Sequence, residues 1–343
     1  MNRLSAEFIK ESEAYYREAA KHTPAPEVER LSALDFCARY DEPAPWRVGP
    51  FVPAPDMTFQ MKGQWRDPLD FGWRSGFVFN PSLIPDAGKL YMFYRAAPHK
   101  ETMSSRIGLA VYENGKGWTD YGRNPVIFPE YEHEVVSTED PKVYRAGGRY
   151  VLFYNGIWKT AEKNPSVAVD MCCAVSDDLL HWEKRGIVVP REISKLWVKA
   201  AVIPKDAEGN AVKLNGKYLM YISEGCGGVQ YIGLSDDLLH WEFEPKTYLD
   251  VSAMGALYEV ACAIPSETND DLVLDFFYSD KRGQYAAGQA LYSQKAPFTQ
   301  KALAAGGCLS WGGLVRFGGR RIFAQGWDAK DGENIMYFYE CLR

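Results

Sequence analysis

From about residue 76 onward, short apolar runs alternate with glycine, aspartate and asparagine. Apolar runs of this length, separated by turn-forming residues, are typical of β-strands. Clear examples are residues 89–94, 150–154 and 217–221. The pattern therefore predicts a mostly β structure for this part of the chain.

An octapeptide, SDDLLHWE, occurs at residues 176–183 and recurs unchanged at residues 235–242. A looser copy lies at residues 108–118. Each exact copy follows an apolar strand, so the repeat indicates a recurring structural unit. We expect its Ser and Asp to hold a turn and its Trp to pack on the sheet. His181 and His240 are then structural, because a ligand would not repeat as part of a scaffold turn.

Five units of about 60 residues follow one another along the chain, within the usual range of blade numbers for propellers. In each unit an inner strand is followed by a glycine-containing turn and a second apolar strand. The sequence therefore predicts an all-β fold, a five-bladed β-propeller, over residues 57–343. A pair of β-sandwiches is the alternative, but it does not explain the regular period.

The first 56 residues have a different pattern. Residues 4–21 carry an approximate apolar stripe with Ser5 as a candidate N-cap, which predicts a helix. Residues 23–56 are rich in proline, which predicts an extended arm with one short helix near residues 28–40. We therefore expect an N-terminal helical extension, residues 1–56. It can brace the propeller or join two subunits of a homo-oligomer.

Composition narrows the function classes. The net charge of −6 and the pI near 5.6 argue against a nucleic-acid partner, whose phosphates require a basic surface. The seven cysteines show no C-x-x-C spacing, which favours reduced thiols in a cytoplasmic protein. No long apolar run or signal-peptide core is present, so we expect no membrane partner. No His/Asp/Glu cluster has ligand spacing, so we expect neither a metal nor another cofactor.

Polar residues recur at the same phase of four predicted inner strands: Asn80, Asp140, Lys199 and Glu259. The innermost strands of a propeller line its axis, so these side chains should converge in one funnel. Buried charges are costly unless they are paired or used. The pattern therefore predicts a site for a polar ligand. Two simpler readings stay open: the charges fill the axis with salt bridges, or Asp140 only opens a turn before Pro141.

Several short motifs together resemble glycoside hydrolase family 130, the propellers that include β-mannoside phosphorylases and β-mannosidases. The motifs are FNP at 79–81, YRA at 94–96, EDP at 139–141, WVK at 197–199, YISE at 221–224, YE at 258–259 and WD at 327–328. The resemblance covers residues 75–343. It implies that Asp140 is the proton donor, acting through a sugar hydroxyl. It also implies that Asn80, Arg95 and Asp328 hold the sugar.

The chain departs from the phosphorylase pattern at two strand ends. Residues 223–225 read SEG where that pattern has His-Arg-Pro, and residues 278–280 read YSD where it has Tyr-His-Gly. Among cations that could contact the substrate or a phosphate, Lys199 and Arg185 remain. Acidic groups near an anion site would repel phosphate.

Glu224 and Glu259 stand where the hydrolase-like branch of the family carries its acids. An inverting glycosidase needs a general acid and a general base on opposite sides of the bond. We therefore predict inverting hydrolysis of a β-glycosidic, β-mannosidic bond in an oligosaccharide. Asp140 is the expected acid, and Glu224 or Glu259 the expected base.

Three other functions remain open from the sequence. The first is a phosphorylase that releases mannose 1-phosphate from β-mannosides. The second is a family 43-type glycosidase, although those enzymes carry an Asp on the first blade where this chain has Asn80. The third is a non-catalytic propeller that binds glycans.

Overall fold

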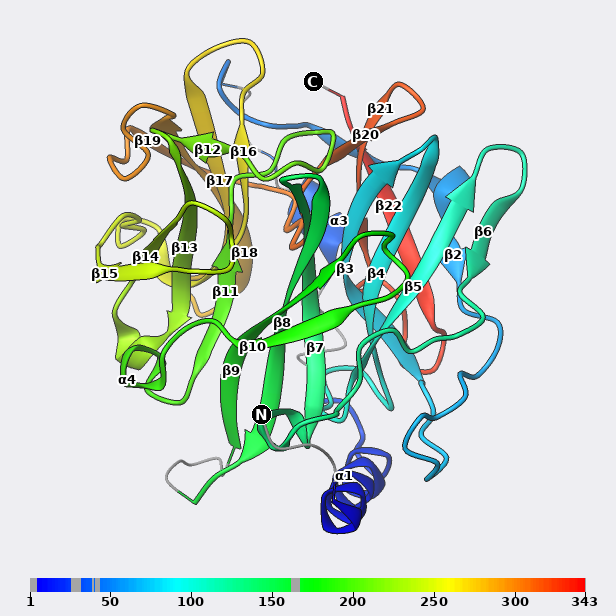
Figure 1. The fold of residues 1–343 in the computed structure, drawn as a ribbon. Coiled ribbons are helices and arrows are strands. Elements are labelled where there is room, and N and C mark those ends of the chain that lie inside the picture. The colour runs from blue at the N-terminus through cyan, green and yellow to red at the C-terminus, as the bar shows by residue number, and fades with distance from the viewer. Residues whose placement is uncertain (1–4, 26–31, 39, 41–43, 162–166, 343) are drawn as a thin grey trace.

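Five antiparallel sheets surround one axis, so the predicted five-bladed β-propeller is confirmed (Figure 1). The computed structural model describes residues 5–25, 32–38, 40, 44–161 and 167–342. The first blade contains β3 (Phe77–Asp86), β4 (Lys89–Ala97), β5 (Arg106–Glu113) and β6 (Gly117–Asp120). The second contains β7 (Ser137–Ala146), β8 (Arg149–Lys159), β9 (Val167–Ser176) and β10 (Glu183–Ile187).

The next two blades have the same plan. The third contains β11 (Val198–Val202), β13 (Lys217–Gly225), β14 (Tyr231–Ser235) and β15 (Glu242–Pro245), with β12 (Lys213–Leu214) paired to β13. The fourth contains β16 (Gly255–Pro265), β17 (Asp271–Asp280), β18 (Tyr285–Ser293) and β19 (Ala302–Ala305). In all four blades the innermost strand comes first in the sequence.

Strands from both ends of the chain build the fifth blade. It contains β20 (Val315–Phe317), β21 (Arg320–Gln325), β22 (Ile335–Cys341) and β1 (Phe51–Pro53), and β2 (Phe59–Gln60) also pairs with β22. Because β1 is hydrogen-bonded to β22, the two ends of the chain close the ring together. β1 lies within the expected N-terminal arm, and the division of the chain at residue 56 stays a prediction.

The helices are short and few in the described ranges. They are α1 (Ala6–Ala19), α3 (Ala33–Ala38) and α4 (Arg191–Ser194), with the 3₁₀ turns η1 (Pro55–Met57), η2 (Glu132–Glu134) and η3 (Cys226–Gly228). Ser5 caps α1 as predicted, since its side chain accepts a hydrogen bond from the backbone N–H of Phe8. The arm helix expected near residues 28–40 is α3, although residues 26–31 and 39 lie outside the described ranges.

The repeated octapeptide forms the same turn twice. Ser176 accepts hydrogen bonds from the backbone N–H groups of Asp178 and Leu179, and Asp178 accepts one from the N–H of Leu180. His181 Nδ1 lies 2.7 Å from Asp178 Oδ2 on the surface. His240 makes the same contact with Asp237 in the second copy. Both histidines are therefore structural, as predicted.

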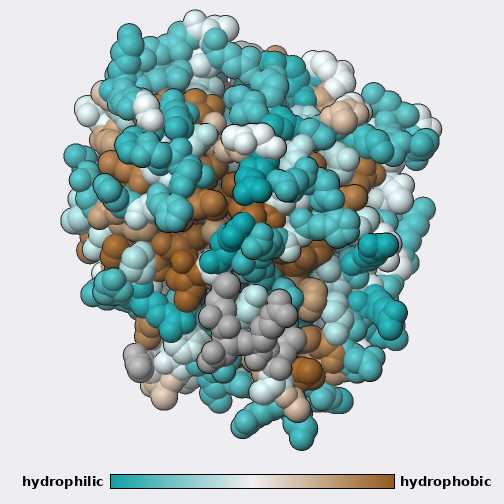
Figure 2. All heavy atoms as spheres, viewed as in Figure 1, coloured by the Kyte–Doolittle hydropathy of each residue, from teal (hydrophilic) through white to brown (hydrophobic). Residues whose placement is uncertain are grey.

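Hydrophilic residues cover most of the surface, and hydrophobic residues fill the core. The face viewed in Figure 1 is mostly hydrophilic, and hydrophobic residues show mainly in its central part (Figure 2). All seven cysteines are free and buried, which matches the predicted reduced thiols. No helix in the described ranges is long and apolar enough to cross a membrane.

The closing strand β1 provides a test of how the ring is held. Phe51 is 7% exposed, and its ring meets that of Phe323 on β21 at 5.4 Å. We expect Phe51→Ala to lower the free energy of unfolding by about 3–5 kcal/mol, because it leaves a cavity at this contact. Urea denaturation measures the change. The control on the same strand is Val52→Ala, where the side chain is exposed and the loss should stay below about 0.5 kcal/mol. Equal losses would show that β1 is not packed as described.

Candidate active site

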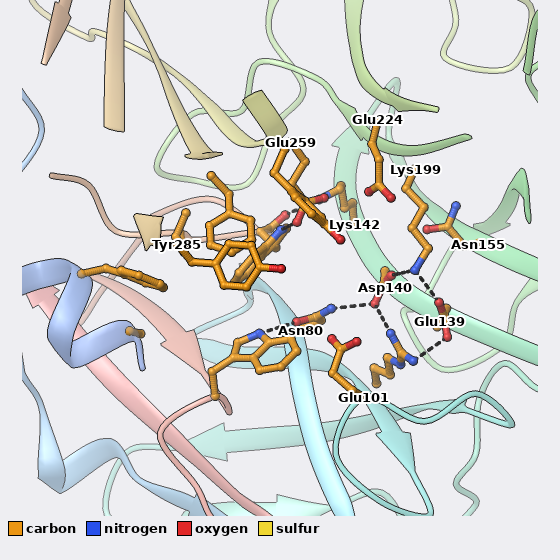
Figure 3. A pocket seen from close by; sticks show the side chains of 18 of the residues that line it. Asn80, Glu101, Glu139, Asp140, Lys142, Asn155, Lys199, Glu224, Glu259 and Tyr285 are labelled. Atoms are coloured by element: carbon orange, nitrogen blue, oxygen red, sulfur yellow. Dashed lines mark hydrogen bonds and ion pairs between the residues drawn. The ribbon is translucent and has the colours of Figure 1, made fainter. Parts of the chain in front are cut away.

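A cavity of about 280 Å³ lies near the starts of the inner strands (Figure 3). It receives most of the residues that the sequence predicted for the site. These are Asn80, Arg95, Asp140, Lys199, Glu224 and Glu259. The predicted convergence of the inner strands is therefore present. Arg95 and Glu224 come from the second strands of their blades, β4 and β13.

Two matching β-bulges aim Asn80 and Asp140 into this cavity. The register shifts between Phe79 and Ser82 in the first blade, and between Glu139 and Lys142 in the second. Asn80 and Asp140 have φ of 46° and 56°, in the left-handed region that Asn and Asp tolerate best among non-glycine residues. A proline follows each of them, and its missing N–H fits a position where the strand ladder is interrupted.

A four-membered network of charges forms one side of the cavity. Arg95 lies 2.7 Å from a Glu139 carboxylate oxygen and 3.1 Å from Asp140 Oδ1. Lys199 Nζ lies 2.7 Å from Glu139 Oε1 and 3.3 Å from Asp140 Oδ2. Each cation therefore bridges both carboxylates. The salt-bridge alternative is correct for these four side chains, yet a cavity remains beside them.

These contacts decide the charge of Asp140. Burial acts to raise the pKa of its carboxyl, but Lys199 and Arg95 outweigh burial and hold the pKa below its usual range. Asn80 Nδ2 donates to Asp140 Oδ1 at 2.7 Å, and Trp327 Nε1 donates to Asn80 Oδ1 at 2.9 Å. This chain fixes the orientation of the Asn80 amide. Asp140 is thus held as a carboxylate.

Glu224 and Glu259 are the other two predicted catalytic acids, and both face the cavity. Burial, together with the charge of Glu224, raises the pKa of Glu259 to about 8. Trp311 Nε1 donates a hydrogen bond to Glu259, and Trp197 Nε1 donates to Glu224 at 3.2 Å. Burial also raises the pKa of Glu224, although Lys199 opposes this shift. At neutral pH Glu259 carries a proton, while Asp140 does not.

Aromatic rings form the opposite side of the cavity. The set comprises Phe36, Tyr258, Phe277, Tyr285, Trp311 and Trp327. Phe277 stacks on Tyr285 with centroids 5.0 Å apart, and Phe36 meets Phe277 edge-on at 5.9 Å. In Figure 3, Tyr285 lies across the cavity from Asn155 and Glu139. The cavity thus has a charged side, mainly from blades one to three, and an aromatic side from blades four and five and the arm. Glu259 of the fourth blade lies among these rings, bonded to Trp311.

Two predicted substrate-binding residues lie outside the cavity lining. Asp328 accepts hydrogen bonds from the Ser32 hydroxyl and the Leu34 N–H at the start of α3, and from the Tyr339 hydroxyl. Arg185 lies on the outer strand β10, is 41% exposed and pairs with Glu183. The positions of Asp328 and Arg185 therefore do not support the predicted contact with substrate. Asp328 instead attaches the arm to the propeller.

Several lining residues were not named as site residues from the sequence. Trp197, Tyr258 and Trp327 belong to the WVK, YE and WD motifs, and Glu139 to the EDP motif, but none was given a role. The others are Ala33, Phe36, Glu101, Met103, Lys142, Asn155, Phe277, Tyr285, Leu309 and Trp311. The same inner-strand phase that predicted Asp140 would have suggested Lys142, two residues along β7. Nothing in the sequence pattern indicates that Phe36 reaches the site.

The charge network yields a prediction about stability. Arg95→Met leaves Glu139, whose side chain is 1% exposed, with one cation fewer. We expect the free energy of unfolding to fall by about 3–5 kcal/mol, the usual cost of breaking a buried pair from one side. Urea denaturation gives the value. Arg185→Met, at an exposed pair, should cost less than about 0.5 kcal/mol. A small loss for Arg95→Met would mean that the network is not held as described.

The raised pKa of Glu259 gives a prediction about pH. Folding raises the pKa of Glu259 from the ordinary value of 4.5 to about 8, so the folded protein keeps this proton to a higher pH than the unfolded chain does. This contribution to stability is complete below pH 4.5 and is lost as the pH rises to about 8. Glu259→Gln removes that loss, so its stability relative to wild type should improve with pH, by up to about 1.4 kcal/mol per unit. Unfolding curves measured across this range test the trend. Glu244→Gln, at an exposed site on β15, should show none, and a pH-independent difference for Glu259→Gln would contradict the assignment.

Comparison with known proteins gives the family. A family model described as beta-1,4-mannooligosaccharide phosphorylase, that of glycoside hydrolase family 130, matches residues 64–292. A 1,2-beta-oligomannan phosphorylase from Thermoanaerobacter sp. (strain X514) is 27% identical over 231 residues, covering 66% of this chain and 72% of that protein. A beta-1,2-mannobiose phosphorylase from the same organism is 27% identical over 164 residues, covering 43% of this chain and 48% of that protein.

Solved structures agree in fold. One of them was reported with the finding that this family of mannoside phosphorylases contains glycoside hydrolases that target beta-1,2 mannosidic linkages in Candida mannan. It superposes with a TM-score of 0.65 and 20% identity, covering 87% of this chain and 95% of that one. At this identity the likeness shows the fold alone. The family match, the shared propeller and the predicted motifs together establish that the chain belongs to glycoside hydrolase family 130, whose members are enzymes that act on glycosides.

Proposed function

We propose that this protein cleaves β-mannosidic bonds of oligosaccharides with inversion, and that water is the attacking molecule. The observation that carries the choice of water is the charge of the cavity lining. Five acidic side chains line it, Glu101, Glu139, Asp140, Glu224 and Glu259, of which Glu259 is protonated at neutral pH, against three basic side chains, Arg95, Lys142 and Lys199. Arg95 and Lys199 each already form ion pairs with both Glu139 and Asp140.

Lys142 is already engaged by a neighbouring group of the protein. Its Nζ donates to the Trp311 carbonyl at 2.9 Å, and burial lowers the pKa of its ammonium group. An attacking phosphate would therefore have to displace existing ion pairs and approach several carboxylates, which is unfavourable in a partly dehydrated site. Water carries no such penalty.

The carboxyl groups of Asp140, Glu224 and Glu259 take different roles in the proposed reaction. Glu224 is the base, because it faces the cavity beside Lys199, whose charge opposes the effect of burial on the pKa of Glu224. Asp140 acts on the leaving oxygen through a sugar hydroxyl, the role implied by the EDP motif. Donation by Asp140 requires substrate binding to raise its pKa against the pull of Lys199 and Arg95. Glu259 is the alternative proton source, since it is protonated at neutral pH.

The charged and aromatic sides suggest how a substrate lies. Asn80, Arg95 and Lys199 surround Asp140 and offer donors to sugar hydroxyls. Aromatic rings such as Tyr258 and Tyr285 offer flat faces to the C–H groups of a second sugar. The bond to be cleaved then lies between the two sides. Cytoplasmic location and assembly through the N-terminal segment stay predictions.

Phosphorolysis is the second candidate, and the comparisons favour it. The matching family model and both curated relatives are described as phosphorylases. In that reaction phosphate takes the place of water and the product is mannose 1-phosphate. We prefer hydrolysis because of the cavity charge. The family 43-type and non-catalytic alternatives have no comparable support.

One experiment separates hydrolysis from phosphorolysis. The protein is incubated with β-1,2- and β-1,4-mannobiose, with and without inorganic phosphate, and products are followed by proton NMR. We expect free mannose without phosphate, appearing first as the α-anomer because of inversion. Glu224→Gln should lower turnover by about 10²–10⁴-fold, whereas Arg185→Met, outside the cavity, should leave it unchanged. Mannose 1-phosphate formed only with phosphate would overturn hydrolysis, and no product would overturn the enzymatic proposal.

The same assay, with an activated aryl β-mannoside, assigns the acid. A good leaving group needs no proton, so the variant that lacks the acid keeps much of its activity on it. Asp140→Asn retains a residue that tolerates the left-handed backbone, and Glu259→Gln is nearly isosteric. Whichever of the two variants the aryl substrate rescues identifies the proton source.

A further inference from the structure

Glu101 occupies an unusual backbone position at the edge of the cavity. It lies in the loop between β4 and β5, in a turn closed by the Thr102 N–H and the His99 carbonyl at 3.2 Å. Its φ is 60°, at the third position of the turn. Turns with positive φ at that position favour glycine or asparagine, because a β-carbon is strained there. A glutamate is therefore a costly choice for this position.

The turn is firmly held without any help from the Glu101 side chain. Lys100 Nζ donates to the carbonyls of Trp327 at 2.9 Å and Ala329 at 3.1 Å, and its backbone N–H donates to Asp331 at 2.7 Å. Arg95 donates to the Thr102 carbonyl at 2.9 Å. In contrast, the Glu101 carboxylate makes no hydrogen bond or ion pair with the residues that the structure describes.

That carboxylate faces the cavity. Figure 3 shows it directed toward the space beside Asp140, and Glu101 is among the lining residues. Arg95 and Lys199 are close enough to act on its charge, as are Glu139 and Asp140. Each of those four side chains already has partners within the network. Glu101 is therefore an exposed acceptor beside a completed network, on a strained but anchored backbone.

Backbone strain that the surrounding structure enforces, at a residue with no structural partner, points to a role in function. We propose that Glu101 determines specificity by accepting hydrogen bonds from hydroxyl groups of the sugar that lies against Asp140. The inference rests on the proposed cleavage of β-mannosides and deepens it. The oxygen atoms of its carboxyl group can accept hydrogen bonds from hydroxyls, which suits a neutral polyol. Beside Glu139 and Asp140 it also disfavours sugars that carry phosphate.

Two substitutions separate a substrate contact from a structural role. Glu101→Gln keeps the shape and removes the charge, whereas Glu101→Gly removes the side chain and relieves the backbone. We expect Glu101→Gly to raise KM for mannobiose about ten- to hundredfold, the loss of one hydrogen bond to a charged acceptor, with kcat changed less than about threefold. Its melting temperature should equal or exceed that of the wild type.

The matched control is Asp70→Gly. Asp70 has φ of 59° on the surface, so the substitution relieves a similar backbone strain away from the cavity. It should leave KM unchanged. Mannose 6-phosphate supplies a second readout: as a competitive inhibitor it should bind more tightly to Glu101→Gln than to the wild type.

The outcomes are distinguishable. An active wild type with an unchanged KM in Glu101→Gly overturns the role of Glu101 and leaves the proposed function standing. A melting temperature well below that of the wild type, with unchanged KM in Glu101→Gln, assigns Glu101 a structural role instead. A wild type that releases no sugar from either mannobiose, with or without phosphate, overturns both.

Discussion

The ion pairs that link Glu139 and Asp140 to Arg95 and Lys199 are the interaction on which the cavity depends. Removing a carboxylate from water costs several kcal/mol unless cations and hydrogen bonds compensate. Glu139 is 1% exposed, and its compensation comes from β4 in the first blade and β11 in the third. The network is complete only when three consecutive blades stand around the axis. Assembly of the ring and formation of the site are therefore one event for these residues.

The two bulges make this network possible. A regular strand would point successive side chains to opposite faces, so Glu139 and Asp140 could not both meet the same two cations. The left-handed backbone at Asp140 breaks that alternation and brings the neighbouring carboxylates onto one network. The same device at Asn80 turns its amide toward Asp140. The strained backbone at Asn80 and Asp140 is thus the structural requirement for the ion pairs and hydrogen bonds at the centre of the propeller.

The sequence revealed those features that repeat with each blade. The period of the apolar runs and the duplicated SDDLLHWE turn predicted the propeller, and the common phase of Asn80, Asp140, Lys199 and Glu259 predicted their convergence. Such features depend on neighbours within one blade, where side-chain periodicity is a direct guide. The FNP, YRA and EDP motifs added Arg95 through resemblance.

Features that depend on distant parts of the chain could not be predicted in this way. Asp328 was predicted to bind the sugar, but its carboxylate oxygens accept hydrogen bonds from the hydroxyls of Ser32 and Tyr339 instead. Phe36 joins the aromatic side from α3, where its ring packs on Phe277 of the fourth blade. Glu101 sits in a loop that belongs to no repeat. In each case the decisive partner lies outside the blade pattern, so no local rule identifies it.

The attachment of α3 and β1 to the propeller determines how far the chain can be shortened. The family match begins at residue 64 and ends at residue 292. A fragment cut to those limits would lack all five strands that pair in the last sheet, as well as the helix that carries Phe36. It would be an open arc with one flank of its pocket missing. The family match therefore covers less of the chain than the folded propeller does, because the fifth blade is built from strands on both sides of the matched residues.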